Sequence, residues 1–332
     1  MARTQRSARF IAGAVAAAGL AGTSLGLGAT SAAATRGHAA VTQTVSVGVL
    51  PIADVAPLYL GMKKGFFADE HLKVVPHVLQ GGAAVASAVV GGSLQFGFGA
   101  TANLILAKSH NLPIQFVANG DEAASHPANA WSGILVGKHS PITSLKQLVG
   151  KTVAANAVQG ENQLALDAIL YRNGINPSSV KVVAIGFPEM PAALASGQVA
   201  AVTEVEPFVS AIAAQGGRLI SPLFEGMQKS MIVAGYFANT KEISSNPTLV
   251  KHFVAAIDRS LNYAQHHSAA VRAIIPTYTK IPASVAAKMH LPIWGAKVRT
   301  ASIQAQENLI RHFGWMSGKV PVSQLVWKGA DR

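Results

Sequence analysis

The chain has 332 residues, of which 50% are apolar and only 13% are charged, and its formal net charge is +12. High hydrophobicity with low charge excludes an intrinsically disordered protein, and the length suffices for two lobes with separate cores. Because the sequence contains no cysteine, disulfides, thiolate metal sites, cysteine nucleophiles and cysteine-linked lipid anchors are excluded.

The positive charge is dispersed along the chain. The longest basic run is the pair Lys63-Lys64, and no basic stripe is interleaved with aromatic residues. This pattern argues against nucleic-acid binding. It is compatible with a surface that steers small anions or contacts anionic envelope polymers.

Residues 1–34 are typical of a secretory signal peptide. An apolar stretch, 10–20, follows a positive region that holds Arg3, Arg6 and Arg9, and Ala32-Ala33-Ala34 provides small residues for cleavage. The alternative is an uncleaved membrane anchor. A run rich in Ala and Gly, however, is only weakly hydrophobic for a membrane-spanning helix. We therefore expect export, cleavage after residue 34 and an unstructured lead over 35–43.

Strand-like and helix-like segments alternate over the next 75 residues. Valine-rich or alternating segments predict strands at 44–50, 72–78, 94–98 and 114–118. Helices are expected between them, at 57–64, 83–90 and 102–109, with Gly65 placed to end the first. Such alternation predicts an α/β protein whose mostly parallel sheet is flanked by helices.

The same pattern then restarts. A short helix is expected at 142–148, strands at 151–155, 180–185, 200–203 and 231–237, and helices at 162–172, 191–196 and 207–215. The chain reads mostly helical after 246, with breaks at Pro276, Pro282 and Pro292.

An internal similarity between 88–97 and 192–201 indicates two lobes of similar construction. We expect lobe 1 to hold 44–132 plus 237–332 and lobe 2 to hold 133–236. The hinge crossings are expected near 131–137 and 233–237.

In open α/β sheets ligands bind beyond the carboxyl ends of the strands. This rule selects 51–56, 80–83, 99–103, 156–161 and 204–207. Where these segments lead into helices, free backbone N–H groups favour anionic ligand groups. The candidate ligand-binding residues are Asp54, Gly81, Gly82, Ala83, Ala100, Thr101, Trp131, Asn156, Gln159, Gly160, Glu206 and Tyr236.

Several of these residues have a structural alternative. Asp54 either binds a positive or N–H-bearing ligand group or braces its turn, and Trp131 is either a stacking wall or hinge packing. Gly81 and Gly82 permit close backbone approach but are also ordinary turn residues. Glu204 and Glu206 have the spacing of an acid/base pair, which we assign no catalytic role. The eleven histidines are scattered, so no metal site is predicted.

Four segments, in order and at matching spacing, resemble the extracytoplasmic substrate-binding proteins of ABC importers. They are Asp54–Phe67, with its Pro-Leu-Tyr turn and Lys-Gly-Phe-Phe, then Gly92–Gly97, Leu145–Val153 and Glu206–Phe208. The most similar subgroup serves sulfonates, taurine, nitrate and thiamine-pyrimidine precursors. The resemblance implies a two-lobe periplasmic-binding-protein fold of type II that closes around a small molecule and delivers it to a permease.

The resemblance leaves the ligand open. A small, sulfonate-like anion is favoured by the basic charge and the helix starts, and a neutral nitrogen heterocycle is the alternative, favoured by Asp54 and the amides. Asn156-Ala-Val-Gln-Gly160 replaces the Gly-Ser/Thr step whose hydroxyls help hold sulfonate-like oxyanions in the family. That departure puts a simple alkanesulfonate in question.

Two alternatives to an importer's binding protein are a sensor that presents the ligand to a receptor and an enzyme. Pyrimidine synthases of this fold rely on a cysteine-containing motif, so no enzyme activity is expected. We expect no cofactor, a monomer, an ABC permease partner, membrane contact only through that permease, and a periplasmic or wall-associated location.

Overall fold

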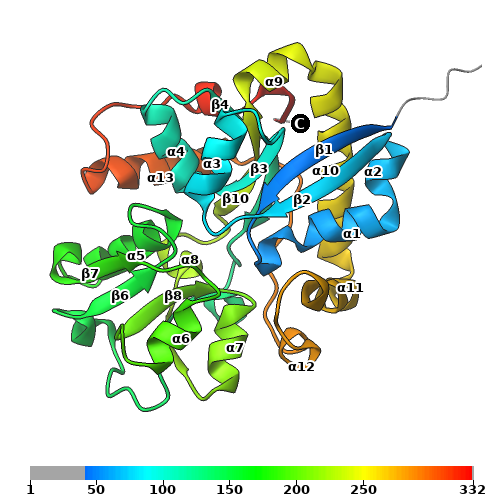
Figure 1. The fold of residues 1–332 in the computed structure, drawn as a ribbon. Coiled ribbons are helices and arrows are strands. Elements are labelled where there is room, and N and C mark those ends of the chain that lie inside the picture. Colours follow the sequence, from blue (N-terminus) through cyan, green and yellow to red (C-terminus); the bar gives the residue numbers. More distant parts are fainter. Residues whose placement is uncertain (1–41, 331–332) are drawn as a thin grey trace, which may run out of the picture. The chain divides into compact units, whose positions relative to one another are not determined.

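The computed structural model describes residues 42–330 of the chain (Figure 1). The predicted signal peptide and most of the lead after it lie outside the described residues. Within 42–330, no helix is both long and apolar enough to cross a membrane.

Two five-stranded sheets organise the described chain. The first has the order β2-β1-β3-β10-β4 and the second β7-β6-β8-β5-β9. The strands of the first are β1 Gln43–Val49, β2 Leu72–Val78, β3 Phe96–Ala100, β4 Ile114–Glu122 and β10 Ile232–Asn239. Those of the second are β5 Ser132–Val136, β6 Thr152–Ala155, β7 Lys181–Ala184, β8 Ala201–Val205 and β9 Arg218–Pro222.

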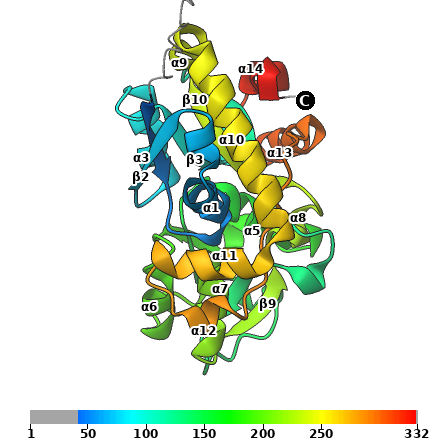
Figure 2. The same ribbon diagram turned by 90° about the vertical axis from the view of Figure 1, so that its right-hand side faces the viewer.

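Helices flank both sheets, and each sheet with its helices is called a lobe here. The first lobe carries α1 Ala56–Lys64, α2 Phe66–Asp69, α3 Gly82–Val90, α4 Thr101–Ser109, α9 Thr240–Ser245, α10 Pro247–His266, α11 Ser268–Ile274, α12 Ala283–Ala286, α13 Thr300–His312 and α14 Val322–Leu325. The second carries α5 Glu161–Arg172, α6 Met190–Ala195, α7 Phe208–Ala214 and α8 Phe224–Met227. The long α10 runs along the first lobe, and α12 reaches the second, where it packs against α7 (Figure 2).

In each sheet, four strands run in one direction and one strand runs against its neighbours. The exceptions are β10, antiparallel to β3 and β4, and β5, antiparallel to β8 and β9. Both are the first strands after the chain has passed from one sheet to the other. Such a strand enters where the parallel strands end, so it must run in the opposite direction. The predicted type II fold, with mostly parallel sheets, is confirmed.

The internal similarity in the sequence corresponds to a structural repeat. The segments 88–97 and 192–201 connect α3 to β3 and α6 to β8, and both strands are third in their sheets. Gly92 and Gly197 end the two helices with φ values of 78° and 75°. A side chain is strained in this left-handed conformation, so glycine is favoured at both turns.

Local chemistry explains the predicted elements. In α1, Pro57 lies in the first turn, where a missing N–H costs nothing, and Gly65 ends the helix in the left-handed conformation at φ 80°. The predicted strands and helices before residue 120 are all present, with ends shifted by a few residues. The expected helix at 142–148 is a short 3₁₀ turn over Leu145–Leu148.

Two strands were missing from the prediction. β5 occupies 132–136, which we expected to be a crossing, and β9 occupies 218–222. The chain passes from the first sheet to the second between β4 and β5, and it returns between β9 and β10.

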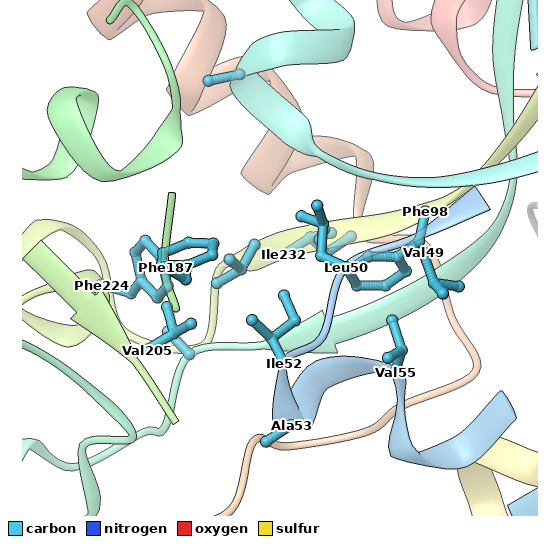
Figure 3. Packing of buried hydrophobic residues seen from close by; sticks show 14 of the residues in the cluster. Val49, Leu50, Ile52, Ala53, Val55, Phe98, Phe187, Val205, Phe224 and Ile232 are labelled. Atoms are coloured by element: carbon cyan, nitrogen blue, oxygen red, sulfur yellow. The ribbon is translucent and has the colours of Figure 1, made fainter. Parts of the chain in front are cut away.

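Buried apolar residues continue from one lobe into the other (Figure 3). Leu50 and Ile52 follow β1, whereas Val205 and Phe187 belong to the second lobe, and all four are less than a tenth exposed. The lobes are therefore packed together around the carboxyl ends of their strands.

Candidate ligand-binding site

The carboxyl ends of the parallel strands in the two sheets meet. After β1, the Ala53 N–H donates to the carbonyl oxygen of Glu206, which follows β8, at 2.9 Å. After β3, the Ala102 N–H donates to a carboxyl oxygen of Glu161, which follows β6, at 2.7 Å. Four of the five segments predicted to bind ligand thus lie at this interface.

A pair of buried carboxyl groups lies on the first-lobe side. Asp54 belongs to a 3₁₀ turn after β1, and Asp121 is near the end of β4; their exposures are 3% and 0%. Burial raises the pKa of Asp54 to about 6, against a hydrogen bond from Asp121, and burial followed by the charge of Asp54 raises that of Asp121. A hydrogen bond between two carboxyl groups requires a proton on one of them. The two carboxyl groups are therefore joined through one proton.

Glu161 and Asn103 cap each other's helices across the interface. Glu161 Oε2 accepts the Ala102 N–H in the first turn of α4, and the Glu161 N–H at the start of α5 donates to Asn103 Oδ1 at 3.4 Å. Glu161 is 1% exposed, and its Oε1 has no hydrogen-bond partner. Burial raises its pKa to about 8, opposed by the hydrogen bond from Ala102. The starts of α4 and α5 are thus occupied by side chains from the opposite lobe.

Three tyrosines border the carboxyl pair. Tyr236, on β10, is fully buried, and its hydroxyl has no hydrogen-bond partner. Burial and, next, the charge of Asp121 raise its pKa. Tyr59 stacks on Tyr278 with ring centroids 4.0 Å apart, and the Tyr278 hydroxyl donates to the Ile52 carbonyl oxygen at 3.0 Å. The site combines aromatic surface with an unused phenol.

On the second-lobe side, the two glutamates at the end of β8 have different environments. Glu204 is fully buried, and its Oε1 has no hydrogen-bond partner. Glu206 accepts hydrogen bonds from the Ser210 N–H at 3.0 Å and from its hydroxyl at 2.7 Å. Burial raises the pKa of Glu206 to about 7, with Ser210 opposing the shift. The Glu206 carboxyl is therefore held by Ser210 in its own lobe and also by the His290 backbone and the charge of Arg272 from the first lobe. Glu204 has the free acceptor.

The buried ionisable side chains of the described chain, tyrosines aside, are all acids, and no Lys, Arg or His in residues 42–330 is buried. The acids are Asp54, Asp121, Glu122, Glu161, Asp167, Glu204, Glu206, Glu225 and Glu307. The basic residues, which outnumber acids in the sequence, are therefore at the surface. An anion held between the lobes would meet carboxyl groups without a buried cation.

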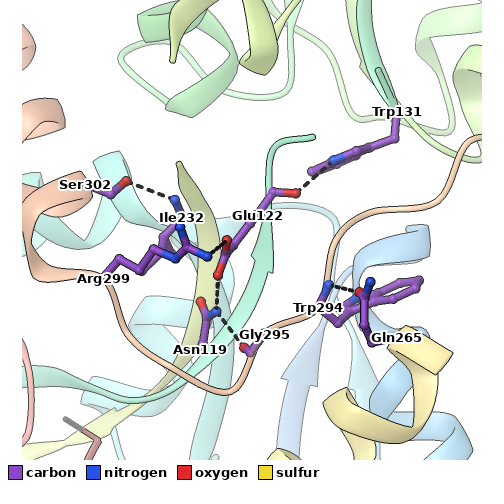
Figure 4. Close-up of polar contacts among 9 residues, drawn as sticks. All are labelled: Asn119, Glu122, Trp131, Ile232, Gln265, Trp294, Gly295, Arg299 and Ser302. Atoms are coloured by element: carbon purple, nitrogen blue, oxygen red, sulfur yellow. Dashed lines mark hydrogen bonds and ion pairs between the residues drawn. The ribbon is translucent and has the colours of Figure 1, made fainter. Parts of the chain in front are cut away.

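Trp131 is part of the packing between the lobes. It is fully buried, and its indole N–H donates to the Glu122 carbonyl oxygen at 3.0 Å (Figure 4). The centre of its ring lies 5.2 Å from that of Phe224. Of the two interpretations of this residue, the contacts favour hinge packing. The Glu122 carboxyl is paired with Arg299 at 3.2 Å, so the C-terminal segment also braces the end of β4.

The candidate residues at the start of α4 make their contacts within the first lobe. Thr101 is fully buried, and its hydroxyl donates to the Ile232 carbonyl oxygen at 3.1 Å. Ala100 is the residue before the helix and is half-buried. The Thr101 hydroxyl therefore joins β10 to α4, and ligand contact by either residue stays a prediction.

At the start of α3, Gly81 and Gly82 are half-buried, and Ala83 is exposed. A Cβ on either glycine would meet no atom within 4 Å, so packing does not require glycine there. This helix start has no side-chain cap, and it stays available for a ligand.

The candidate residues before α5 differ in burial and in hydrogen bonding. Asn156 Oδ1 is buried without a hydrogen-bond partner, whereas Gln159 is exposed. Gly160 is buried, and a Cβ there would lie 3.0 Å from that of Ala157. Asn156 is thus the polar side chain of this group available at the interface.

A groove of about 440 Å³ opens between the lobes beside Tyr278. Its walls include Pro51 and Gln80 from the first lobe and Glu189 and Phe208 from the second. A separate cavity of about 610 Å³, lined in part by Lys138 and Lys151, lies wholly within the second lobe and apart from the carboxyl cluster.

The sequence did not single out several residues of this cluster. They are Tyr59, Asn103, Asp121, Glu161 and Tyr278. Asn103 and Glu161 lie within predicted segments, and extension of the strand predicted at 114–118 would have placed Asp121 at the carboxyl edge. Tyr278 lies far along the chain, and no local pattern marks it.

Comparisons with known proteins agree with this architecture. Residues 52–270 match the family described as NMT1/THI5 like. The riboflavin-binding protein RibY of Chloroflexus aurantiacus is 26% identical over 224 residues, which cover 66% of this chain and 61% of RibY.

Solved structures share the fold. The alkanesulfonate-binding protein SsuA from Xanthomonas axonopodis pv. citri, bound to MOPS, superposes with a TM-score of 0.74 at 19% identity, covering 87% of this chain and 99% of SsuA. The desulfurization enzyme DSZB has a TM-score of 0.65 at 14% identity, covering 87% and 97% of the two chains. With the family match over most of the described residues, the chain belongs to the NMT1/THI5-like family and has the solute-binding-protein fold of ABC importers.

Proposed function

We propose that this protein is an exported solute-binding protein that captures a small organic molecule between its lobes and delivers it to an ABC importer. The family and the fold support this role. In this proposal the protein is a monomer that performs no chemistry on its ligand and contacts the membrane only through the permease. A sensor that presents the ligand to a receptor would use the same site.

The ligand would be a nitrogen heterocycle with N–H groups, the second of the two ligand classes that the sequence left open. The observation that carries this choice is the acceptor-rich interface: Asn156, Glu161 and Glu204 each have a buried oxygen without a hydrogen-bond partner. An N–H donor satisfies such an oxygen, whereas a sulfonate has only acceptor oxygens to offer. Burying a charge without a partner costs several kcal/mol.

The pair Asp54 and Asp121 extends this match. Because the proton of the pair is used in the hydrogen bond between the two carboxyl groups, the pair offers further acceptor oxygens to the N–H groups of a ligand. Tyr59 and Tyr278 provide an aromatic surface for a planar ligand. The relative named as riboflavin-binding supports a heterocyclic ligand, and the neighbour named as alkanesulfonate-binding supports the alternative.

Access would require the lobes to separate, because the carboxyl cluster is buried. Hinge bending between β4 and β5 and between β9 and β10 would open the interface, and ligand would favour closure by contacting both lobes. The lobes of this proposal are the two sheets with their helices, so β5 from Ser132 belongs to the second lobe and β10 from Ile232 to the first. The groove beside Tyr278 would be the point of access.

Native mass spectrometry of residues 35–332, followed by a thermal-shift panel, tests this proposal. We expect a small co-purified mass that disappears on denaturation and stabilisation by pyrimidine-type or flavin-type compounds. Methanesulfonate, taurine and nitrate should have no effect. Stabilisation by sulfonates alone would overturn the ligand class, and turnover of a bound compound would overturn the binding role.

A further inference from the structure

The start of α4 has the geometry of an anion site, yet a side chain of the protein fills it. This nine-residue helix follows β3 directly, and its Ala102 N–H points to the second lobe. Free N–H groups and the helix dipole favour negative charge at such a position. Here the Ala102 N–H is already bound by Glu161 Oε2 at 2.7 Å.

The second observation concerns the other oxygen of this carboxyl group. Glu161 Oε1 is buried and has no hydrogen-bond partner, and the charge of Glu161 contributes to the raised pKa of Asp121. No Lys, Arg or His in residues 42–330 is buried beside it. Capping uses only Oε2, which accepts the Ala102 hydrogen bond. It therefore does not account for the second, buried oxygen that has no partner.

We propose that Glu161 determines ligand specificity: its carboxyl group occupies the position at α4 where an anionic ligand group would bind and so excludes anions. The inference rests on the proposed function, since it explains how a fold shared with a sulfonate-binding protein takes an uncharged or cationic ligand. Glu161 acts in place of the ligand's anionic group and comes from the lobe opposite α4.

Removal of the side chain tests this directly. Glu161→Ala and Glu161→Ser should expose the Ala102 N–H and gain stabilisation by formate and methanesulfonate. At an anion concentration ten times Kd, the melting temperature should rise by about 3 °C. The wild type and Glu161→Gln, in which the position stays filled, should show no such rise at matched ionic strength. Asp167→Ala is the matched control, because it removes another buried acid of α5 that makes no hydrogen bond to Ala102.

An equal response of Glu161→Gln and Glu161→Ala, or no response of the Ala and Ser variants, would overturn the proposal. If these two variants unfold, their refolding yield is measured with and without methanesulfonate. A higher yield with the anion supports the proposal, and an unchanged yield overturns it. Because the probes are simple anions, the result is independent of the natural ligand. A failure here therefore leaves the proposed function to its own test.

Discussion

Asp54→Asn should make the protein more stable at neutral pH while weakening ligand binding. The folded-state pKa of Asp54 is raised from 3.8 to about 6, so between these values the unfolded chain loses a proton that the folded protein keeps. Stability therefore falls as pH rises through this window, and the loss is complete above pH 6. At 1.36 kcal/mol per unit, two units correspond to about 3 kcal/mol. Asn cannot ionise and avoids this cost.

Urea unfolding of wild type and variant at pH 4, 5, 6 and 7.5 measures the effect. Tryptophan fluorescence is a suitable signal, because the indole N–H of Trp294 donates to the Asp54 carbonyl oxygen at 3.1 Å. The variant's advantage should grow by about 1–3 kcal/mol from pH 4 to 7.5. Asp69→Asn, at an exposed acid paired with Arg259, is the control and should show no such growth. An advantage that does not change with pH would refute the reasoning.

Three further substitutions separate ligand contacts from packing. Tyr236→Phe removes a buried hydroxyl without a partner, so the free energy of unfolding should change by less than about 1 kcal/mol. Ligand affinity, measured by calorimetry, should fall about tenfold. An unchanged affinity would show that Tyr236 does not contact the ligand. Trp131→Phe should lower the unfolding free energy by about 2–4 kcal/mol through lost packing on Phe224 and a lost hydrogen bond, with ligand affinity preserved in the folded fraction. Arg299→Ala should raise the pKa of Glu122 and cost about 1 kcal/mol more at pH 8 than at pH 5, a difference that pH-dependent urea unfolding would detect or exclude.

Most of the βα framework could be predicted because its signals are local. Alternating valines marked β1, and Gly65 marked the end of α1, as the structure confirms. β5 and β9 were missed because they follow a change of lobe or a helix end, and their pairing comes from the other strands of the sheet. Trp131 was open to two interpretations, since a sequence does not say which neighbour an indole N–H meets.

The sequence by itself determined the alternation of strands and helices, the carboxyl edges where a ligand would bind, and the resemblance that the family match bears out. Each depends on periodicity or on residue types close together in the chain. Only the tertiary structure decided what lies across the interface. Glu161 accepts a hydrogen bond from Ala102, which lies 59 residues away in the chain. Asp54, after β1, contacts Asp121 near the end of β4. Burial then sets their proton affinity, and burial is a property of the assembled lobes.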